Sequence, residues 1–146
     1  MVMKWYNYLL ILWCLPQFLL FLIIMCVLKG VHNSNVKYKG RPVYVFDKKA
    51  SKLNSFFSGT ALFFTIIPTD AGKKTIAHEH GHHIQGNYWG WLYLPVIGIS
   101  SIRNNLKSRT CYKTWENYYK LYPEAQADRL GGVVWVNGER VYKGAA

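Results

Sequence analysis

The first part of the chain is a long apolar segment, and this segment constrains the fold more than any other feature. Twenty-four residues lie between Lys4 and Lys29 without a charge, and they are rich in leucine, isoleucine, phenylalanine and tryptophan. A helix that rises roughly 1.5 Å per residue needs about 20 such residues to cross a bilayer core about 30 Å thick. A cleaved signal peptide would have a shorter apolar core followed by a small-residue cleavage site. We therefore expect residues 1–29 to form a transmembrane anchor.

The charges that flank this segment predict its orientation. One lysine precedes it, whereas four basic residues follow it closely: Lys29, Lys37, Lys39 and Arg41. Because positive charges collect on the cytoplasmic side of a span, we expect a single-pass membrane protein whose remaining domain faces the cytoplasm. The net charge of +11 fits a domain beside anionic membrane lipid, which is an expected partner. The basic residues are dispersed and no nucleic-acid-binding motif occurs, so nucleic acid is not expected as a partner.

Beyond the expected anchor, the chain is long enough for one small domain. The polar segment 30–40 is typical of a linker, and residues 41–146 suffice for one hydrophobic core. Within that domain, segments 43–46 and 60–67 are short, apolar and rich in β-branched or aromatic residues, as strands are. The pair Asn137-Gly138 between two apolar runs predicts a C-terminal β-hairpin. With the helices described below, the expected fold class is α+β.

Two further segments carry weaker signals. Residues 89–99 are nearly all apolar but too few to cross a bilayer, so we expect a buried core segment. A re-entrant or interfacial segment stays open as the alternative, because two tryptophans lie at its start. Residues 112–121 are typical of a helix that runs toward the next motif.

A histidine pair one helical turn apart is the main chemical signature of the chain. The sequence His78-Glu79-His80-Gly81-His82 places the first and last histidines at positions i and i+4, which share one face of a helix. His78 and His82 can therefore bind one metal ion, while Glu79 leans toward the open coordination position as a general base. His80 and His83 lie off this face and could face solvent, contact substrate or form an alternative metal pair. A histidine-rich tract can also bind metal without any catalysis.

Zinc of the catalytic type takes three protein ligands and a water molecule, so a third ligand is needed. Glu124 is the candidate, because Pro123 before it and Gly131-Gly132 after it are typical of the two ends of a helix. On that helix Asp128 shares a face with Glu124 and can accept a hydrogen bond from the second nitrogen of a ligand histidine. Two structural roles stay open as alternatives. Glu124 could be an ordinary surface carboxylate that the dipole at a helix N-terminus favours, and Asp128 could pair with a nearby lysine.

These two motifs resemble those of the gluzincin metallopeptidases, most closely the membrane-bound members of the HtpX type. Such proteins pair a His-Glu-x-x-His helix with a downstream Glu-x-x-Ala-Asp, which here is Glu124-Ala125-Gln126-Ala127-Asp128. The resemblance implies that His78, His82 and Glu124 bind Zn²⁺ and that Glu79 activates water. It also implies a zincin-like fold in which the strand at 60–67 offers its edge to an extended substrate. The chain is similar as well to small membrane proteins that carry the same pair of motifs, whose substrates the resemblance does not supply.

Together these features predict a membrane-anchored zinc metallopeptidase, with the anchor at 1–29, the linker at 30–40 and a zincin-like metallopeptidase domain at 41–146. The predicted reaction is hydrolysis of a bond in a peptide or protein substrate. Zn²⁺ lowers the pKa of its bound water, and Glu79 takes the proton and passes it to the leaving amine. Two alternatives remain open: a metal-binding membrane protein without catalysis, and an inactive adaptor that keeps the zincin fold.

Overall fold

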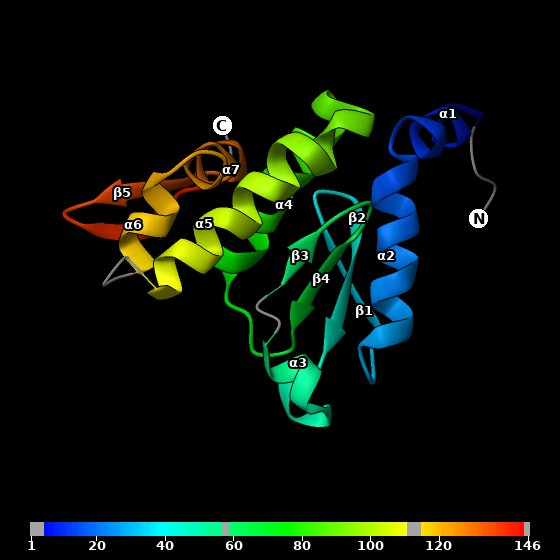
Figure 1. Cartoon of the computed structure of the whole chain (residues 1–146), viewed down its shortest axis with the longest axis horizontal. Coiled ribbons are helices and arrows are strands. Elements are labelled where there is room, and N and C mark those ends of the chain that lie inside the picture. Colours follow the sequence, from blue (N-terminus) through cyan, green and yellow to red (C-terminus); the bar gives the residue numbers. More distant parts are fainter. Residues whose placement is uncertain (1–4, 57–58, 111–114, 145–146) are drawn as a thin grey trace.

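The structure is a computed structural model that describes residues 5–56, 59–110 and 115–144. Helices pack beside a small sheet, and a separate hairpin lies at the C-terminal end (Figure 1). The helices are α1 (Trp5–Trp13), α2 (Leu15–Val27), α3 (Lys52–Phe56), α4 (Lys73–Trp89), α5 (Ile99–Thr110), α6 (Trp115–Lys120) and α7 (Glu124–Gly131). The strands are β1 (His32–Tyr38), β2 (Arg41–Phe46), β3 (Thr60–Ala61), β4 (Thr65–Pro68), β5 (Val133–Val136) and β6 (Glu139–Tyr142). Single helical turns form η1 (Lys48–Ala50), η2 (Gly90–Leu92) and η3 (Leu94–Gly98).

The larger sheet has four strands in the order β1-β2-β4-β3. β2 and β4 run parallel, whereas β1 pairs antiparallel with β2 and β3 pairs antiparallel with β4. Every residue of β4 is buried, as expected of an inner strand covered on both faces. β2 confirms the strand predicted at 43–46. The single strand predicted at 60–67 is instead two short strands, because Leu62 N donates a hydrogen bond to Phe64 O and the chain reverses there.

The apolar N-terminal segment forms two helices rather than one. α1 ends at Trp13 and α2 begins at Leu15, with Pro16 in the first turn of α2, where a missing N–H group is tolerated. In the part of the chain that the structure describes, no helix combines the length and the apolar character needed to cross a membrane. The prediction of a transmembrane anchor at 1–29 is therefore wrong, and so is the single-pass membrane localisation. The cytoplasmic orientation has no basis without the span.

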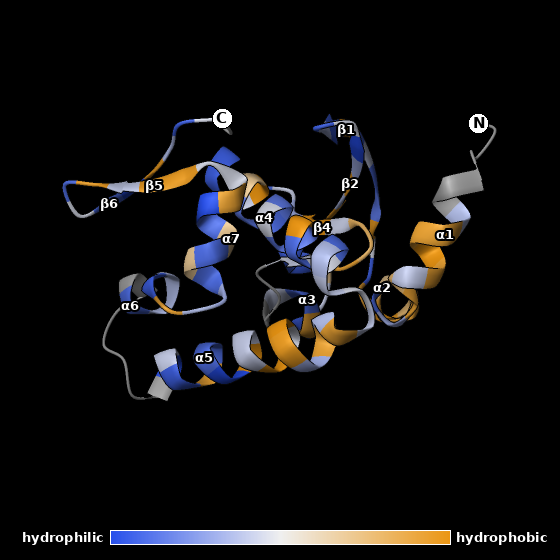
Figure 2. Cartoon of the chain, turned by 90° about the horizontal axis from the view of Figure 1, so that it is seen from above, coloured by the Kyte–Doolittle hydropathy of each residue, from blue (hydrophilic) through white to orange (hydrophobic). Residues whose placement is uncertain are grey.

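The physical reason is that α2 packs against the protein's own core. Figure 2 shows α1 and α2 as largely apolar helices. Yet Phe21 in the middle of α2 is only 4% exposed, and Leu28, just after α2, is only 3% exposed. The other members of this hydrophobic core are Phe46, Leu62, Ile66, Tyr93 and Ile97. Gln17 Nε2 of α2 also donates a hydrogen bond of 2.6 Å to Gly90 O. A helix that buries one face against protein can have the same composition as a helix in lipid, so hydropathy alone predicted a span.

Two other segments differ in part from the sequence prediction. Residues 30–40, expected as a linker, form β1 and the turn into β2. β1 is an edge strand with mostly exposed residues, so its polar sequence lacks the apolar alternation that reveals a half-buried strand. The segment 89–99 supplies Tyr93 and Ile97 to the core, as expected of a buried segment, but Trp91 and Leu92 are exposed.

Close packing of α4 on α7 sets the position of the candidate site. A Cβ atom added to Gly81 of α4 would lie 1.8 Å from Ala127 O, and one added to Gly131 of α7 would lie 2.0 Å from Ala77 O. The absence of a side chain at both glycines lets the two backbones come into contact. As a result, the first turn of α7 lies beside the middle of α4.

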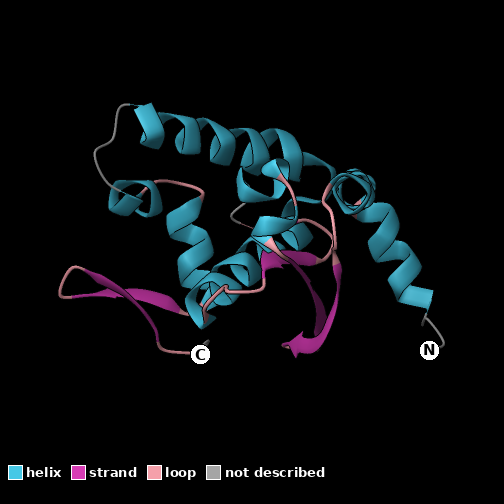
Figure 3. Ribbon diagram, turned by 90° about the horizontal axis from the view of Figure 1, so that it is seen from below, coloured by secondary structure: helices cyan, strands magenta, loops and turns pink. Residues whose placement is uncertain are grey.

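The C-terminal hairpin extends beyond α7, separate from the four-stranded sheet (Figure 3). β5 and β6 pair antiparallel, and the turn residues Asn137 and Gly138 have φ values of 49° and 82°, as a type I′ turn requires. Gly132, in the left-handed conformation, caps the C-terminal end of α7. The predicted hairpin, the predicted ends of the α7 helix and the α+β class are confirmed. Of the helix predicted at 112–121, α6 is observed, and residues 111–114 lie outside the described residues.

Candidate metal centre

Three side chains from two helices meet beneath the surface. His78 and His82 lie one turn apart on α4, and Glu124 is the first residue of α7. Glu124 Oε2 is 3.1 Å from His78 Nε2 and 3.0 Å from His82 Nε2. One ligand atom from each of the three residues lies within 4.8 Å of the others, and all three residues are buried. The structure thus brings together the three residues that the sequence predicted as metal ligands.

The donor set fits a metal ion. Two ligand atoms on one tetrahedral ion, with bonds of about 2.0–2.1 Å, lie ~3.4 Å apart, close to the separations of 3.0 and 3.1 Å seen here. Among the described residues, Glu124 Oε1 is buried and has no hydrogen-bond partner, which is costly for a carboxylate unless a cation compensates. Two imidazole nitrogens and a carboxylate oxygen suit several divalent metals. His78, His82 and Glu124 therefore form a possible metal site whose geometry does not specify the metal.

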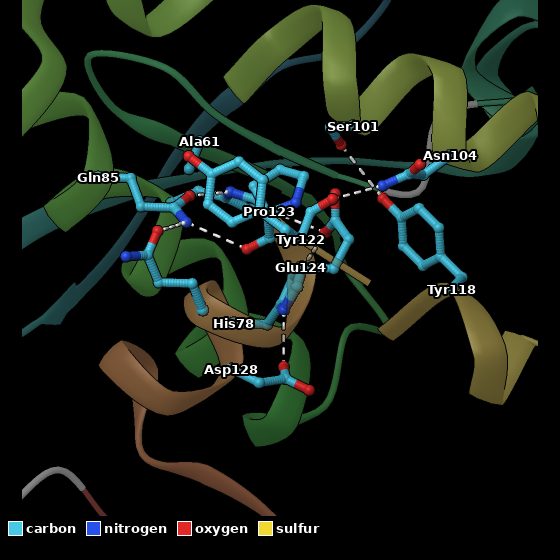
Figure 4. A network of polar contacts seen from close by, with 12 residues as sticks. Ala61, His78, Gln85, Ser101, Asn104, Tyr118, Tyr122, Pro123, Glu124 and Asp128 are labelled. Atoms are coloured by element: carbon cyan, nitrogen blue, oxygen red, sulfur yellow. Dashed lines mark hydrogen bonds and ion pairs between the residues drawn. The ribbon is translucent and has the colours of Figure 1, made fainter. Parts of the chain in front are cut away.

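Each histidine is oriented by a hydrogen bond at its other nitrogen. His78 Nδ1 lies 2.7 Å from Asp128 Oδ1, which is the contact expected of Asp128, and Figure 4 shows this pair. His82 Nδ1 lies 2.8 Å from Gln85 Oε1. If each ring donates from Nδ1, as it would with a metal ion bound at Nε2, the lone pair of Nε2 is left for that ion. Asp128 and Gln85 therefore favour the tautomer that a metal ion needs.

The ionisable side chains of the site shift one another's pKa values. Burial lowers the pKa of His78, but hydrogen bonds to Asp128 and Glu124 outweigh it and raise the pKa to about 9. Burial alone would raise the pKa of Glu124, yet hydrogen bonds from the two histidines hold it well below its usual value. The pKa of Asp128 is lowered in the same way, against burial, by His78 and Arg140. The centre of the cluster is thus an environment that favours positive charge.

Glu79 lies next to this cluster without belonging to it. Its carboxylate is buried, and a Cβ atom added to Gly59, just before β3, would lie 3.3 Å from Glu79 Oε1. Burial raises the pKa of Glu79, and the nearby His78 and His82 oppose this only in part. A carboxylate with a raised pKa that is not a ligand has the properties of a general base.

A cavity of about 730 Å³ adjoins the cluster and is lined by His78, Glu79 and His82 as well as by both residues of β3. Its apolar walls come from α2 and α5 and include Leu20, Ile24, Ile99, Ile102 and Leu106. A volume of this size accommodates several residues of a peptide or a small organic molecule. The candidate metal site is therefore reachable by a ligand that lies along β3.

Several residues of the site were missed in the sequence. Gln85 follows His82 by three residues on α4, so the i, i+3 spacing could have identified it. Arg140 of β6 donates hydrogen bonds to both carboxylate oxygens of Asp128, and no local pattern signals this contact. Tyr118 and Tyr119, which lie close to Glu124 in the sequence but could not be assigned to the site from it, also line the cavity. Burial and then the charge of Glu124 raise the pKa of Tyr118, so its hydroxyl remains protonated.

The other two histidines of the tract lie apart from the cluster. His83 Nδ1 lies 3.1 Å from Leu62 O, and His83 Nε2 accepts a hydrogen bond from Arg41. The ring of His80 packs edge to face on Tyr38 at 5.1 Å. Burial, followed by the charge of Arg41, lowers the pKa of His83 to about 3. Both nitrogens of His83 are thus engaged by protein groups, which disfavours His80 and His83 as an alternative metal pair.

Comparisons of the chain with models of protein families, with curated proteins and with solved structures gave no match. Any functional proposal therefore depends on the residues of the site and their geometry.

Proposed function

We propose that the chain is a zinc-dependent peptidase in which His78, His82 and Glu124 bind Zn²⁺ and Glu79 is the general base. The observation that carries this proposal is the buried cluster of two imidazoles and a carboxylate beside a cavity that also contains Glu79. Three protein ligands leave a fourth position for water, as in catalytic zinc sites. The resemblance of both motifs to those of gluzincin metallopeptidases supports zinc over other divalent metals.

The residues of the site have separate roles in the proposed reaction. Bound Zn²⁺ would supply Lewis-acid activation of a water molecule and of the scissile carbonyl group. Glu79 accepts the proton of the attacking water and donates it to the leaving amine, for which its raised pKa is suited. Asp128 and Gln85 hold the two histidines with Nε2 toward the ion.

The substrate of this proposal is an extended peptide. β3 lies at the edge of the four-stranded sheet and lines the cavity beside Glu79. A peptide that pairs with this edge would place one of its carbonyl groups next to the metal site. Main-chain pairing of this kind gives affinity with little sequence selectivity, so we expect broad specificity.

Substitution of Glu79 tests the proposal. Glu79→Gln keeps the shape of the side chain but removes its basicity, so hydrolysis of a fluorescein-labelled unfolded protein should fall by about 10²–10⁴-fold. The variant should still bind one zinc per chain, because Glu79 is not a ligand. Glu139→Gln, at an exposed carboxylate of β6, is the matched control and should retain full activity.

Unchanged hydrolysis by Glu79→Gln would contradict the proposed role of this residue. Stoichiometric zinc without hydrolysis by the wild type would support the first alternative, a metal-binding protein without catalysis. If the wild type neither binds zinc nor hydrolyses the protein, the result would support the second alternative, an inactive adaptor.

A further inference from the structure

The C-terminal hairpin reaches back to the metal site through one side chain. Arg140 of β6 donates from Nε to Asp128 Oδ2 at 2.8 Å and from Nη2 to Asp128 Oδ1 at 2.6 Å. The side chains of Arg140 and Asp128 are only 16% and 3% exposed. A guanidinium that contacts both oxygens of a carboxylate fixes its position and its rotation. Asp128 is therefore held in place by a strand that lies ten residues or more away from it in the chain.

The carboxylate that Arg140 holds is the one that orients His78. Asp128 Oδ1 accepts from His78 Nδ1 at 2.7 Å as well as from Arg140 Nη2. On its other side, the guanidinium of Arg140 stacks 3.3 Å from the centre of the Tyr119 ring. That ring meets the His78 ring edge to face at 5.2 Å. Arg140 thus contacts two of the groups that pack against His78, Asp128 and Tyr119.

We propose that Arg140 is a positioning residue of the metal site, which acts through Asp128 to hold His78 Nε2 toward the ion. This inference rests on the proposed function only in that His78 is taken as a zinc ligand. Without Arg140, the Asp128 carboxylate is free to rotate, and the His78 ring loses its fixed orientation. The C-terminal hairpin thereby determines how tightly the metal is bound.

The test is the dissociation constant of zinc, measured on the full chain at 25 °C by competition with a chromophoric chelator. Arg140→Gln should weaken zinc binding by about 10–100-fold, the usual effect of losing a group that supports a ligand. Arg129→Gln is the matched control, because it removes the same charge one residue after Asp128 at an exposed position. The control should bind zinc like the wild type. Equal affinity in Arg140→Gln and wild type would overturn the proposal.

A double-mutant cycle separates positioning from general stability. If Arg140 acts through Asp128, adding Arg140→Gln to Asp128→Asn should cause no further loss of zinc affinity. Full additivity of the two losses would overturn the proposal. A merely structural Arg140 would lower the melting temperature in EDTA and leave the zinc affinity of the folded protein unchanged.

Two controls keep the test decisive. If Arg140→Gln does not fold, Arg140→Lys replaces it, because lysine keeps the charge but cannot contact both carboxylate oxygens as arginine does. Arg140→Lys should also bind zinc less tightly than the wild type. Wild-type zinc affinity in Arg140→Lys would overturn the proposal. Failure of the wild type to bind zinc would contradict the proposed function itself. If the wild type binds zinc and Arg140→Gln binds it with the same affinity, the result would overturn this inference but not the proposed function.

Discussion

Three carboxylates lie inside the protein at the candidate metal centre, although ionised carboxylates are strongly hydrated. Glu79, Glu124 and Asp128 are 8%, 0% and 2% exposed, in a chain with 7 acidic and 18 Lys and Arg residues. Burial of such a group is costly unless positive charges and hydrogen bonds compensate. Around Glu124 and Asp128, the compensation comes from two imidazoles and one guanidinium. At the scale of single residues, this concentration of buried charge is what distinguishes the candidate site from the rest of the described residues.

Gln85 provides a prediction at this scale. Its Oε1 accepts from His82 Nδ1, while its Nε2 donates to Pro123 O and to Gln126 Oε1. Gln85→Ala should weaken zinc binding by at least about tenfold, because His82 loses the partner that fixes its tautomer. It should also lower the free energy of unfolding by about 1–3 kcal/mol, because buried polar groups lose their partners. Competition titration and urea unfolding measure the two effects.

The control for Gln85 is its neighbour in the same network. Gln126→Ala removes one partner of Gln85 but leaves the bonds to His82 and Pro123 in place. Its zinc affinity should remain within about twofold of the wild type, since no group that supports a ligand is lost. Wild-type zinc affinity in Gln85→Ala would show that this hydrogen bond does not orient His82.

Residue types and local spacing were enough to predict which three residues meet in the buried cluster. The i, i+4 relation of His78 and His82 is a property of one helix, and so is the relation of Glu124 to Asp128. The position of Glu124 next to the histidines depends on a contact between two helices. It was nevertheless indicated by the pairing of the His-Glu-x-x-His motif with the downstream Glu-x-x-Ala-Asp motif. Arg140 was not predictable, because its contact requires that the hairpin fold back over α7, and no periodicity within the strand encodes that.

At the scale of elements, the contact of α4 with α7 makes the site. Both helices bring a glycine to the crossing, and each glycine faces a backbone carbonyl of the other helix. α4 supplies His78 and His82, and α7 supplies Glu124 and Asp128. A change in the distance between the two helices would therefore separate the donor atoms.

Two glycines of α4 form a matched pair for testing this contact. A Cβ atom at Gly81 would lie 1.8 Å from Ala127 O, whereas one at Gly86 would have its nearest contact with Tyr93 at an ordinary 3.7 Å. Gly81→Ala should destabilise the protein by about 1–3 kcal/mol or more, because α7 has to move. Its zinc affinity should fall by more than about tenfold, a loss in the range seen when ligand geometry is disturbed. Gly86→Ala should be neutral or stabilising by up to about 1 kcal/mol, as alanine favours helix over glycine.

Urea unfolding and zinc titration of these two variants compare the positions directly. If Gly81→Ala kept the stability and zinc affinity of Gly86→Ala, the close contact of the two helices would not be what assembles the site.

Elements with their own turn chemistry were the predictable ones. Asn137-Gly138 specified the hairpin, and Pro123 with Gly132 specified the ends of α7, because these residues favour particular backbone angles. The reversal between β3 and β4 contains only apolar and aromatic residues, so nothing in the sequence marked it as a turn. β1 was missed because an exposed edge strand has no buried face to produce alternation.

At the scale of the whole molecule, the N-terminal helices belong to the folded domain. α2 contributes Phe21 to the core, Trp13 Nε1 donates a hydrogen bond of 2.9 Å to Asn87 O of α4, and Leu20 and Ile24 line the cavity beside the site. The sequence indicated apolar helical structure here, but not that it divides into two helices or that the protein's own core covers it. A domain of this size depends on such a helix for much of its core, so α1 and α2 form part of the same unit as the candidate metal centre.

Zinc binding to the purified chain shows whether α4 and α7 together hold one zinc ion. The wild type should bind one zinc per chain. Glu124→Ala should weaken that binding by more than about 100-fold, because loss of a ligand costs more than loss of a supporting group, and Glu139→Ala should bind like the wild type. A wild type without stoichiometric zinc, or a Glu124→Ala variant with unchanged affinity, would contradict a zinc site between α4 and α7.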